Sequence, residues 1–322
     1  MLAYVLLIIG FVLLIKGADF FVDGSCGMAR LLRIPSVIIG LTVVAFGTSM
    51  PEASVSINAA LEGANELSLS NVIGSNIFNL LVVTGFCAAI RPLPVTASVM
   101  KKEFPFSIVI TGALLVMSLD TLFFRGTNNT ISRINGMILL VFFVAFVAST
   151  VRDALRSRRE HQDAAEDFKP LHPMTSILYI VGGLAGIVIG GDLVVQSASQ
   201  IAVSFGLSQT LIGLTIVALG TSLPELVTSI MAARKGENDI ALGNVVGSNI
   251  FNILLVLGAS SALHPVEVNR ESIYDIIILI VTSIMVYLFG ARRKNISRLE
   301  GMLMLAAYAA FFFFITIRDG VI

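Results

Sequence analysis

Two short runs of residues combine side chains that bind hard cations with a proline that breaks helices. Residues 45–52 read Ala-Phe-Gly-Thr-Ser-Met-Pro-Glu, and residues 218–225 read Ala-Leu-Gly-Thr-Ser-Leu-Pro-Glu. Both runs lie in the middle of apolar stretches, where a charged side chain costs about 2.5–3.5 kcal/mol unless it faces water, a partner or an ion. Glu52 and Glu225 are therefore the first residues whose position needs a chemical explanation.

A proline precedes each glutamate and disturbs the helix around it. Pro51 and Pro224 lack an N–H, and their rings crowd the carbonyl four residues earlier, which predicts broken helices near Gly47 and Gly220. Backbone carbonyls released by such breaks become available as ligands.

A second polar segment follows each run, with the sequence Gly-Ser-Asn-Ile-Phe-Asn at residues 74–79 and 247–252. Ser75 and Asn79 are four residues apart and share one helix face, as do Ser248 and Asn252. Such side chains also form hydrogen bonds between membrane helices, which is the alternative explanation for each one taken singly. We expect the remaining asparagines to face elsewhere and to join helices: Asn71, Asn76, Asn244 and Asn249.

Together these residues would supply carboxylate, hydroxyl, amide and carbonyl oxygens, a set that suits Ca²⁺ or Na⁺. The three histidines lie outside the apolar stretches, and Cys26 and Cys87 are isolated, so no soft-metal site is expected. The sequence indicates no cofactor.

The composition points to a membrane protein. Hydrophobic residues make up 56% of the 322 positions and charged residues 13%, with a formal net charge of zero. This balance gives no support to a nucleic-acid partner. The expected partner is the lipid bilayer, and no obligate protein partner is evident. The apolar stretches contain neither HExxH nor a pair of nucleophile and base, so an intramembrane enzyme is disfavoured.

The pattern of apolar stretches predicts an all-α membrane protein with ten transmembrane helices. Their centres lie near residues 12, 48, 80, 112, 143, 186, 221, 251, 281 and 308. The stretches near 112 and 281 look short, with Pro105 and Tyr274 at their edges, so eight spans are the alternative.

An internal repeat relates the two halves. Residues 40–79 align with 213–252 without a gap, and 25 of the 40 positions are identical. Five spans per copy make the second copy enter the membrane from the opposite side. We therefore expect a first inverted repeat at 1–151, a linker at 152–172 and a second inverted repeat at 173–322.

Basic residues orient the predicted helices, because cytoplasmic loops are enriched in Lys and Arg. One side of the membrane collects 16 of the 21 basic residues, including those of the linker at 152–172. This predicts a cytoplasmic linker and two extracellular termini in a multi-pass protein of the plasma membrane. Asp19, which the repeat aligns with Asp192, is expected to have a structural role, pairing with Lys16.

The duplicated motifs resemble the two α-repeats of the sodium/calcium exchanger family of calcium/cation antiporters, over the whole chain. The resemblance implies exchange of Na⁺ for Ca²⁺ by alternating access, with an ion site formed by the second, third, seventh and eighth helices. It makes Glu52 and Glu225 the central Ca²⁺ ligands, with Asn79 and Asn252 completing their ring. Some prokaryotic relatives have Asp in place of Asn252.

The resemblance also implies a set of Na⁺ ligands that includes six hydroxyl side chains and two backbone carbonyls. The hydroxyls are those of Thr48, Ser49, Ser75, Thr221, Ser222 and Ser248, and the carbonyls are those of Ala45 and Ala218. Antiport of Ca²⁺ coupled to H⁺, or dependent on K⁺, stays open as the alternative, since a carboxylate in a low dielectric can also carry a proton. A channel is less favoured, because a pore lining needs no inverted pair of broken helices.

Overall fold

The computed structural model describes residues 2–119, 129–160, 172–206, 216 and 218–318. The predicted linker therefore lies only partly within the described residues: the helix before it continues to Glu160, and 161–171 are outside. Arg125, which contributed to the predicted orientation, is also outside them.

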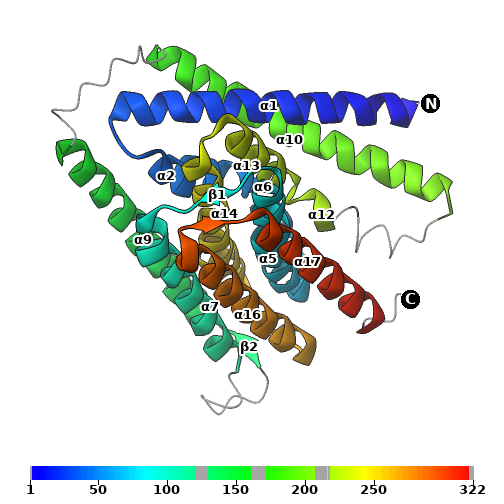
Figure 1. The fold of residues 1–322 in the computed structure, drawn as a ribbon. Helices are drawn as coiled ribbons and strands as arrows, with labels where there is room; N and C mark the ends of the chain where they lie inside the picture. Colours follow the sequence, from blue (N-terminus) through cyan, green and yellow to red (C-terminus); the bar gives the residue numbers. More distant parts are fainter. Residues whose placement is uncertain (1, 120–128, 161–171, 207–215, 217, 319–322) are drawn as a thin grey trace.

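The described part of the chain is almost entirely helical (Figure 1). In the first half the helices include three π-helical segments, labelled η. They are α1 (Leu2–Leu32), α2 (Ser36–Ile39), η1 (Gly40–Val44), α3 (Ala45–Thr48), α4 (Met50–Leu61), α5 (Asn65–Phe78), η2 (Asn79–Val83), α6 (Thr84–Ile90), η3 (Val99–Glu103), α7 (Phe104–Ser118) and α9 (Arg133–Glu160). Those of the second half are α10 (Pro173–Ser204), α12 (Ala218–Gly220), α13 (Leu223–Lys235), α14 (Asn238–Phe251), η5 (Asn252–Leu257), α15 (Gly258–Leu263), α16 (Arg270–Arg293) and α17 (Arg298–Arg318).

Seven of the described helices are long and apolar enough to cross a membrane, and the bent pair α2–α4 makes eight. The segment near residue 281 was expected to be short, and this expectation is wrong: α16 has 24 residues, and Tyr274 lies inside it. Its start is stabilised by the Asn269 side chain, which accepts the Ser272 N–H at 2.7 Å. Within it, the Asp275 carboxylate pairs with Arg318 at 2.7 Å. These polar contacts extend the helix beyond its apolar stretch.

Elements of the two halves recur at the spacing of the repeat. Helices α5 and α14 begin and end at positions that the repeat aligns, and each continues into a π-helix. Two short antiparallel pairs join the halves at equivalent places: β1 (Leu93–Pro94) with β4 (Asn295–Ile296), and β2 (Thr130–Ile131) with β3 (Val266–Glu267). The halves are therefore interlocked rather than separate units.

Burial separates central helices from peripheral ones. In α14–α15, 94% of the apolar segment is buried, against 17% in α17. The exposed side of the peripheral helices is rich in large apolar side chains, including Ile8 and Phe11 of α1 and Val141 of α9. In water such a surface would be unstable, so it is the face that contacts lipid.

Helices α1 and α10 lie side by side along one edge of the molecule (Figure 1). Their contact depends on glycines that let the two backbones meet. A Cβ added at Gly183 would stand 2.6 Å from the Phe21 nitrogen and 2.7 Å from the Gly17 oxygen, and one at Gly190 would stand 2.5 Å from the Leu14 nitrogen.

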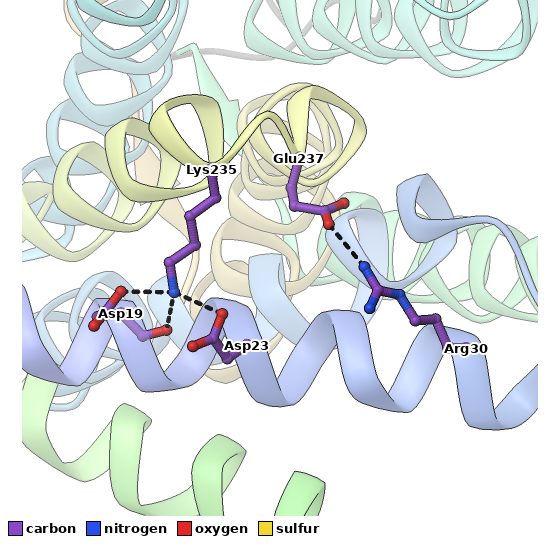
Figure 2. Close-up of polar contacts among 5 residues, drawn as sticks. All are labelled: Asp19, Asp23, Arg30, Lys235 and Glu237. Atoms are coloured by element: carbon purple, nitrogen blue, oxygen red, sulfur yellow. Dashed lines mark hydrogen bonds and ion pairs between the residues drawn. The ribbon is translucent and has the colours of Figure 1, made fainter. Parts of the chain in front are cut away.

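Ion pairs tie α1 to the turn between α13 and α14 (Figure 2). The Lys235 ammonium lies 2.6 Å from Oδ1 of both Asp19 and Asp23, and Arg30 lies 3.3 Å from Glu237. The expected pairing of Asp19 with Lys16 is therefore replaced by a contact between halves. A helix turn places Asp19 and Asp23 on one face, and that face meets the end of α13.

We predict that Gly183→Ala lowers the stability of the protein, because the new methyl group would overlap the α1 backbone. Overpacking of this kind costs about 1–3 kcal/mol. Thermal unfolding in detergent, followed by the loss of a monodisperse peak, measures the effect. The control is Gly182→Ala on the next residue of α10, where an added Cβ meets nothing within 4 Å. Equal stability of the two variants would contradict the proposed close packing of α1 and α10.

Candidate functional site

The two predicted breaks are present, and each places a glutamate in the first turn of a helix. Helix α3 ends at Thr48 and α4 starts at Met50, with a bend of 48° between the two parts. Pro51 is near the start of α4, where its missing N–H removes no helical hydrogen bond. Glu52 follows, at the helix end whose partial positive charge favours an anion.

The second half repeats this arrangement. Helix α12 ends at Gly220 and α13 begins at Leu223, followed by Pro224 and Glu225. The side chains of Glu52 and Glu225 are both 0% exposed. Two carboxylates are thus held inside the protein, each in the first turn of a helix.

Serines of one half hydrogen-bond the glutamate of the other. The Ser222 hydroxyl donates to Glu52 Oε1 at 3.0 Å, and the Ser49 hydroxyl donates to Glu225 Oε1 at 3.1 Å. Ser248 lies 3.4 Å from the same Glu225 oxygen, and Ser75 lies 3.1 Å from the Ser222 hydroxyl. The structure therefore brings both glutamates and all four predicted serines into one cluster between the halves.

The two predicted threonines lie at the breaks. Thr48 is fully buried, and its hydroxyl is 3.0 Å from Asn244 Oδ1 and 3.5 Å from Ser248 Oγ. Thr221 is half-buried in the turn between α12 and α13.

Asn79 and Asn252 each begin a π-helical segment, a feature common at functional sites that the sequence pattern did not reveal. Both side chains are 0% exposed. Their nitrogens donate across the interface between halves, Asn79 to Asn249 Oδ1 at 3.2 Å and Asn252 to Asn76 Oδ1 at 3.1 Å.

Four buried oxygens of this cluster have no hydrogen-bond partner among the described residues: Oε2 of Glu52, Oε2 of Glu225, Oδ1 of Asn79 and Oδ1 of Asn252. Most of the other buried oxygens without a partner are serine or threonine hydroxyls, which rotate freely, and the rest are single oxygens of Glu103, Asn238 and Asn295. A carboxylate or amide oxygen has no such freedom, and leaving it unpaired costs about 1–3 kcal/mol or more. The four oxygens are therefore free to bind an ion, and a cation is what they would attract.

One of the two predicted backbone ligands differs from the simple expectation. The Ala45 carbonyl is not released by the break, because it accepts the Ser49 N–H at 3.0 Å and the Thr48 hydroxyl at 3.4 Å. An ion at this oxygen would share it with those donors. Ala218 is the first residue of α12, and its side chain is not among those described.

The asparagines expected to join helices do so at the site itself. The Asn71 nitrogen lies 2.9 Å from Ser56 Oγ and 3.3 Å from the Glu52 carbonyl. Asn244 has the equivalent contacts, with Ser229 at 3.0 Å and the Glu225 carbonyl at 3.5 Å. Reasoning from helix faces missed that these amides secure the backbone of the two glutamates.

The donor set consists of oxygens of two carboxylates, several hydroxyls and two amides. No group of three or more His, Cys, Asp or Glu side chains that could hold a metal occurs among the described residues. Such a mixture of charged and neutral oxygens suits weakly held Ca²⁺ or Na⁺ better than a tightly bound transition metal.

Comparison with known proteins gives consistent matches over nearly the whole chain. The model of the family "Sodium/calcium exchanger protein" matches residues 2–151 and 175–317. The putative antiporter CaxA of Alkalimonas amylolytica is 37% identical over 319 residues, which are 97% of this chain and 98% of that protein. The sodium/calcium exchanger MaX1 of Methanosarcina acetivorans is 31% identical over 338 residues, covering 96% and 97% of the two chains.

Solved structures of the sodium-calcium exchanger NCX_Mj are also similar. One of them, soaked with Na⁺ and Ca²⁺, superposes with a TM-score of 0.82 and 32% sequence identity over 99% of this chain and 98% of that one. Members of this family are membrane antiporters of Ca²⁺ and Na⁺ that need no cofactor, and they are not enzymes. With two buried glutamates in duplicated motifs and matches along its full length, the chain belongs to the sodium/calcium exchanger family.

Proposed function

We propose that this protein exchanges Na⁺ for Ca²⁺ across the membrane, with one site between the two halves offered to each side in turn. The observation that carries the proposal is the set of four unpaired buried oxygens on Glu52, Glu225, Asn79 and Asn252. Ionised carboxylates without a counter-charge are unfavourable inside an apolar protein, so the site gains free energy when it takes up a cation.

Charge explains why the two ions would compete. Glu52 and Glu225 bear two negative charges when ionised, which one Ca²⁺ balances, and Na⁺ ions offer an alternative way to supply positive charge. If the protein changes conformation only when its carboxylates are neutralised, neither ion crosses without exchange for the other. Coupling then follows from the cost of moving an uncompensated charge through the bilayer.

The hydroxyl groups are the proposed Na⁺ ligands, namely those of Thr48, Ser49, Ser75, Thr221, Ser222 and Ser248, together with the carbonyls of Ala45 and Ala218. The distances support this role for the serines. Ser49, Ser222 and Ser248 lie within hydrogen-bonding distance of a glutamate oxygen, and Ser75 contacts Ser222. A hydroxyl can donate its proton to a carboxylate while its lone pairs bind a cation.

The topology that we propose has ten spans in two inverted repeats of five. The two spans beyond the eight candidates above are α7 together with η3 and α13 together with α12. On their own, α7 has 15 residues and α13 has 13. The recurrence of α5 and α14 at the spacing of the repeat, and the equivalent β1–β4 and β2–β3 pairs, support a two-fold relation. The loop charges favour extracellular termini and a cytoplasmic segment 152–172.

The pair of α1 and α10 is the proposed moving part. Their glycines bring the two backbones into close contact, so that the helices pack as one layer along the edge of the bundle. Sliding of this layer past the broken helices would open the site to one side and close it to the other.

We predict that proteoliposomes loaded with Na⁺ take up ⁴⁵Ca²⁺ when they are diluted into Na⁺-free medium. The outward Na⁺ gradient supplies the free energy for Ca²⁺ entry. Vesicles loaded with K⁺, or with a pH gradient in the absence of Na⁺, are the controls and should take up little Ca²⁺.

Uptake driven by the pH gradient alone would replace Na⁺ with H⁺ as the coupling ion. A requirement for K⁺ together with Na⁺ would identify K⁺-dependent exchange. Single-channel currents across a planar bilayer would reject exchange altogether.

We predict that Glu52→Gln and Glu225→Gln each abolish Ca²⁺ exchange while the protein remains folded. Each change removes one of the two charges that balance Ca²⁺, which should weaken Ca²⁺ binding by about 3 kcal/mol or roughly 100-fold. The measurement is Na⁺-dependent ⁴⁵Ca²⁺ uptake, with size-exclusion chromatography as the test of folding.

The matched control for these variants is Glu103→Gln. Glu103 is a buried glutamate, 7% exposed, at the end of η3, and the charges near it are those of Lys102 and Asp153. This variant should retain exchange. Near-normal exchange in Glu52→Gln or Glu225→Gln would refute the proposed site.

A further inference from the structure

Two asparagines join the halves through a reciprocal pair of hydrogen bonds. The side-chain nitrogen of Asn76 donates to the Asn249 backbone oxygen at 3.2 Å, and that of Asn249 donates to the Asn76 backbone oxygen at 3.3 Å. A backbone carbonyl only accepts hydrogen bonds, so the NH₂ group of each side chain must face it. The orientation of both amides is thereby determined by the backbone.

The orientation of this first pair of amides determines the orientation of a second pair. Once their NH₂ groups are engaged, Asn249 and Asn76 present Oδ1 to the side-chain nitrogens of Asn79 and Asn252, at 3.2 and 3.1 Å. An amide oxygen also only accepts, so Asn79 and Asn252 must turn their NH₂ groups toward it. Their own Oδ1 atoms therefore point the other way, where both are buried and unpaired.

We propose that Asn76 and Asn249 are positioning residues, which hold the side-chain oxygens of Asn79 and Asn252 toward the transported cation. This inference rests on the proposed function, in which those two oxygens bind Ca²⁺. The connection crosses between halves: Asn249 orients Asn79, and Asn76 orients Asn252. Without it, rotation of either amide by half a turn would present NH₂ to a cation and repel it.

The same geometry accounts for an amide at position 252. Asn76 Oδ1 needs a hydrogen-bond donor opposite it, and an ionised carboxylate there would set oxygen against oxygen. The Asn252 amide supplies the donor at every pH, and Asn79 does so for Asn249. In this chain the two amides therefore bring neutral oxygens to the ring and do not ionise, so that the charge of the ring resides on Glu52 and Glu225.

Double-mutant cycles test the crossed connection. Equilibrium ⁴⁵Ca²⁺ binding to the purified protein in detergent is measured for Asn249→Leu and Asn76→Leu, which preserve shape but remove the amide. Each should weaken Ca²⁺ binding about 10-fold, as loss of an outer partner of a metal ligand commonly does. Asn249→Leu should cause little further loss of Ca²⁺ affinity in a protein that already carries Asn79→Ala, whereas its effect should be independent of Asn252→Ala. Conversely, Asn76→Leu should cause little further loss beside Asn252→Ala and should act independently of Asn79→Ala.

The cycles separate positioning from local packing. Asn249 near the end of α14 precedes Asn252, the first residue of η5, by about one helical turn, so a purely structural defect would couple these two residues. Coupling of Asn249→Leu to Asn252→Ala, or to neither variant, would overturn the proposal. Wild-type protein that binds no Ca²⁺ would instead contradict the proposed function itself.

A measurement on the wild-type protein keeps the test independent of whether the leucine variants fold. In protein labelled with ¹³C at the asparagine side-chain carbonyl, Ca²⁺ should shift the resonances of Asn79 and Asn252, assigned with Asn79→Ala and Asn252→Ala. The resonances of Asn76 and Asn249 should move less, since their oxygens remain bonded to NH₂ groups. A larger shift at Asn76 and Asn249 would show that the roles are reversed.

Discussion

The arrangement of this protein depends on two buried carboxylates that form no ion pair among the residues that the structure describes. Glu52 and Glu225 are fully buried, and their side chains accept hydrogen bonds from serine hydroxyls. Helix N-termini and hydroxyl donors reduce the cost of this burial, but they leave one oxygen of each glutamate unpaired. Such a site gains most from a mobile cation, which fits the family to which the chain belongs.

Hydrogen bonds that cross between the two halves build the site, so both halves are needed to form it. Ser49 serves Glu225, Ser222 serves Glu52, and Asn76 and Asn249 bond to each other's backbone. Neither half alone contains a complete set of partners. Separation of the halves would therefore break hydrogen bonds of both glutamates together.

The glycine contact between α1 and α10 contrasts with this polar centre. It brings the two helix backbones together, while the ion pairs from Lys235 and Arg30 hold α1 to the second half at the edge of the bundle. Ion pairs that are partly exposed contribute about 0–1 kcal/mol each, so they position a helix without preventing its movement.

The sequence alone predicted the features that have local causes. Pro51 and Pro224 broke their helices where expected, because a proline ring excludes the preceding helical geometry whatever surrounds it. The aligned helices α5 and α14 have the same length, because identical residues in similar apolar surroundings form the same helix. Residue types also indicated an oxygen site centred on Glu52 and Glu225.

Only the tertiary structure decided which groups meet. Asn76 and Asn249 looked like residues that simply join helices, and their crossed bonds became apparent once the halves were packed together. Asp19 was expected to pair with Lys16 in its own helix but contacts Lys235, which belongs to the other half of the chain. The Ala45 carbonyl, next to a predicted break, keeps its hydrogen bond from Ser49. Spacing along one helix specifies a face, whereas the partner of that face depends on how separate helices pack.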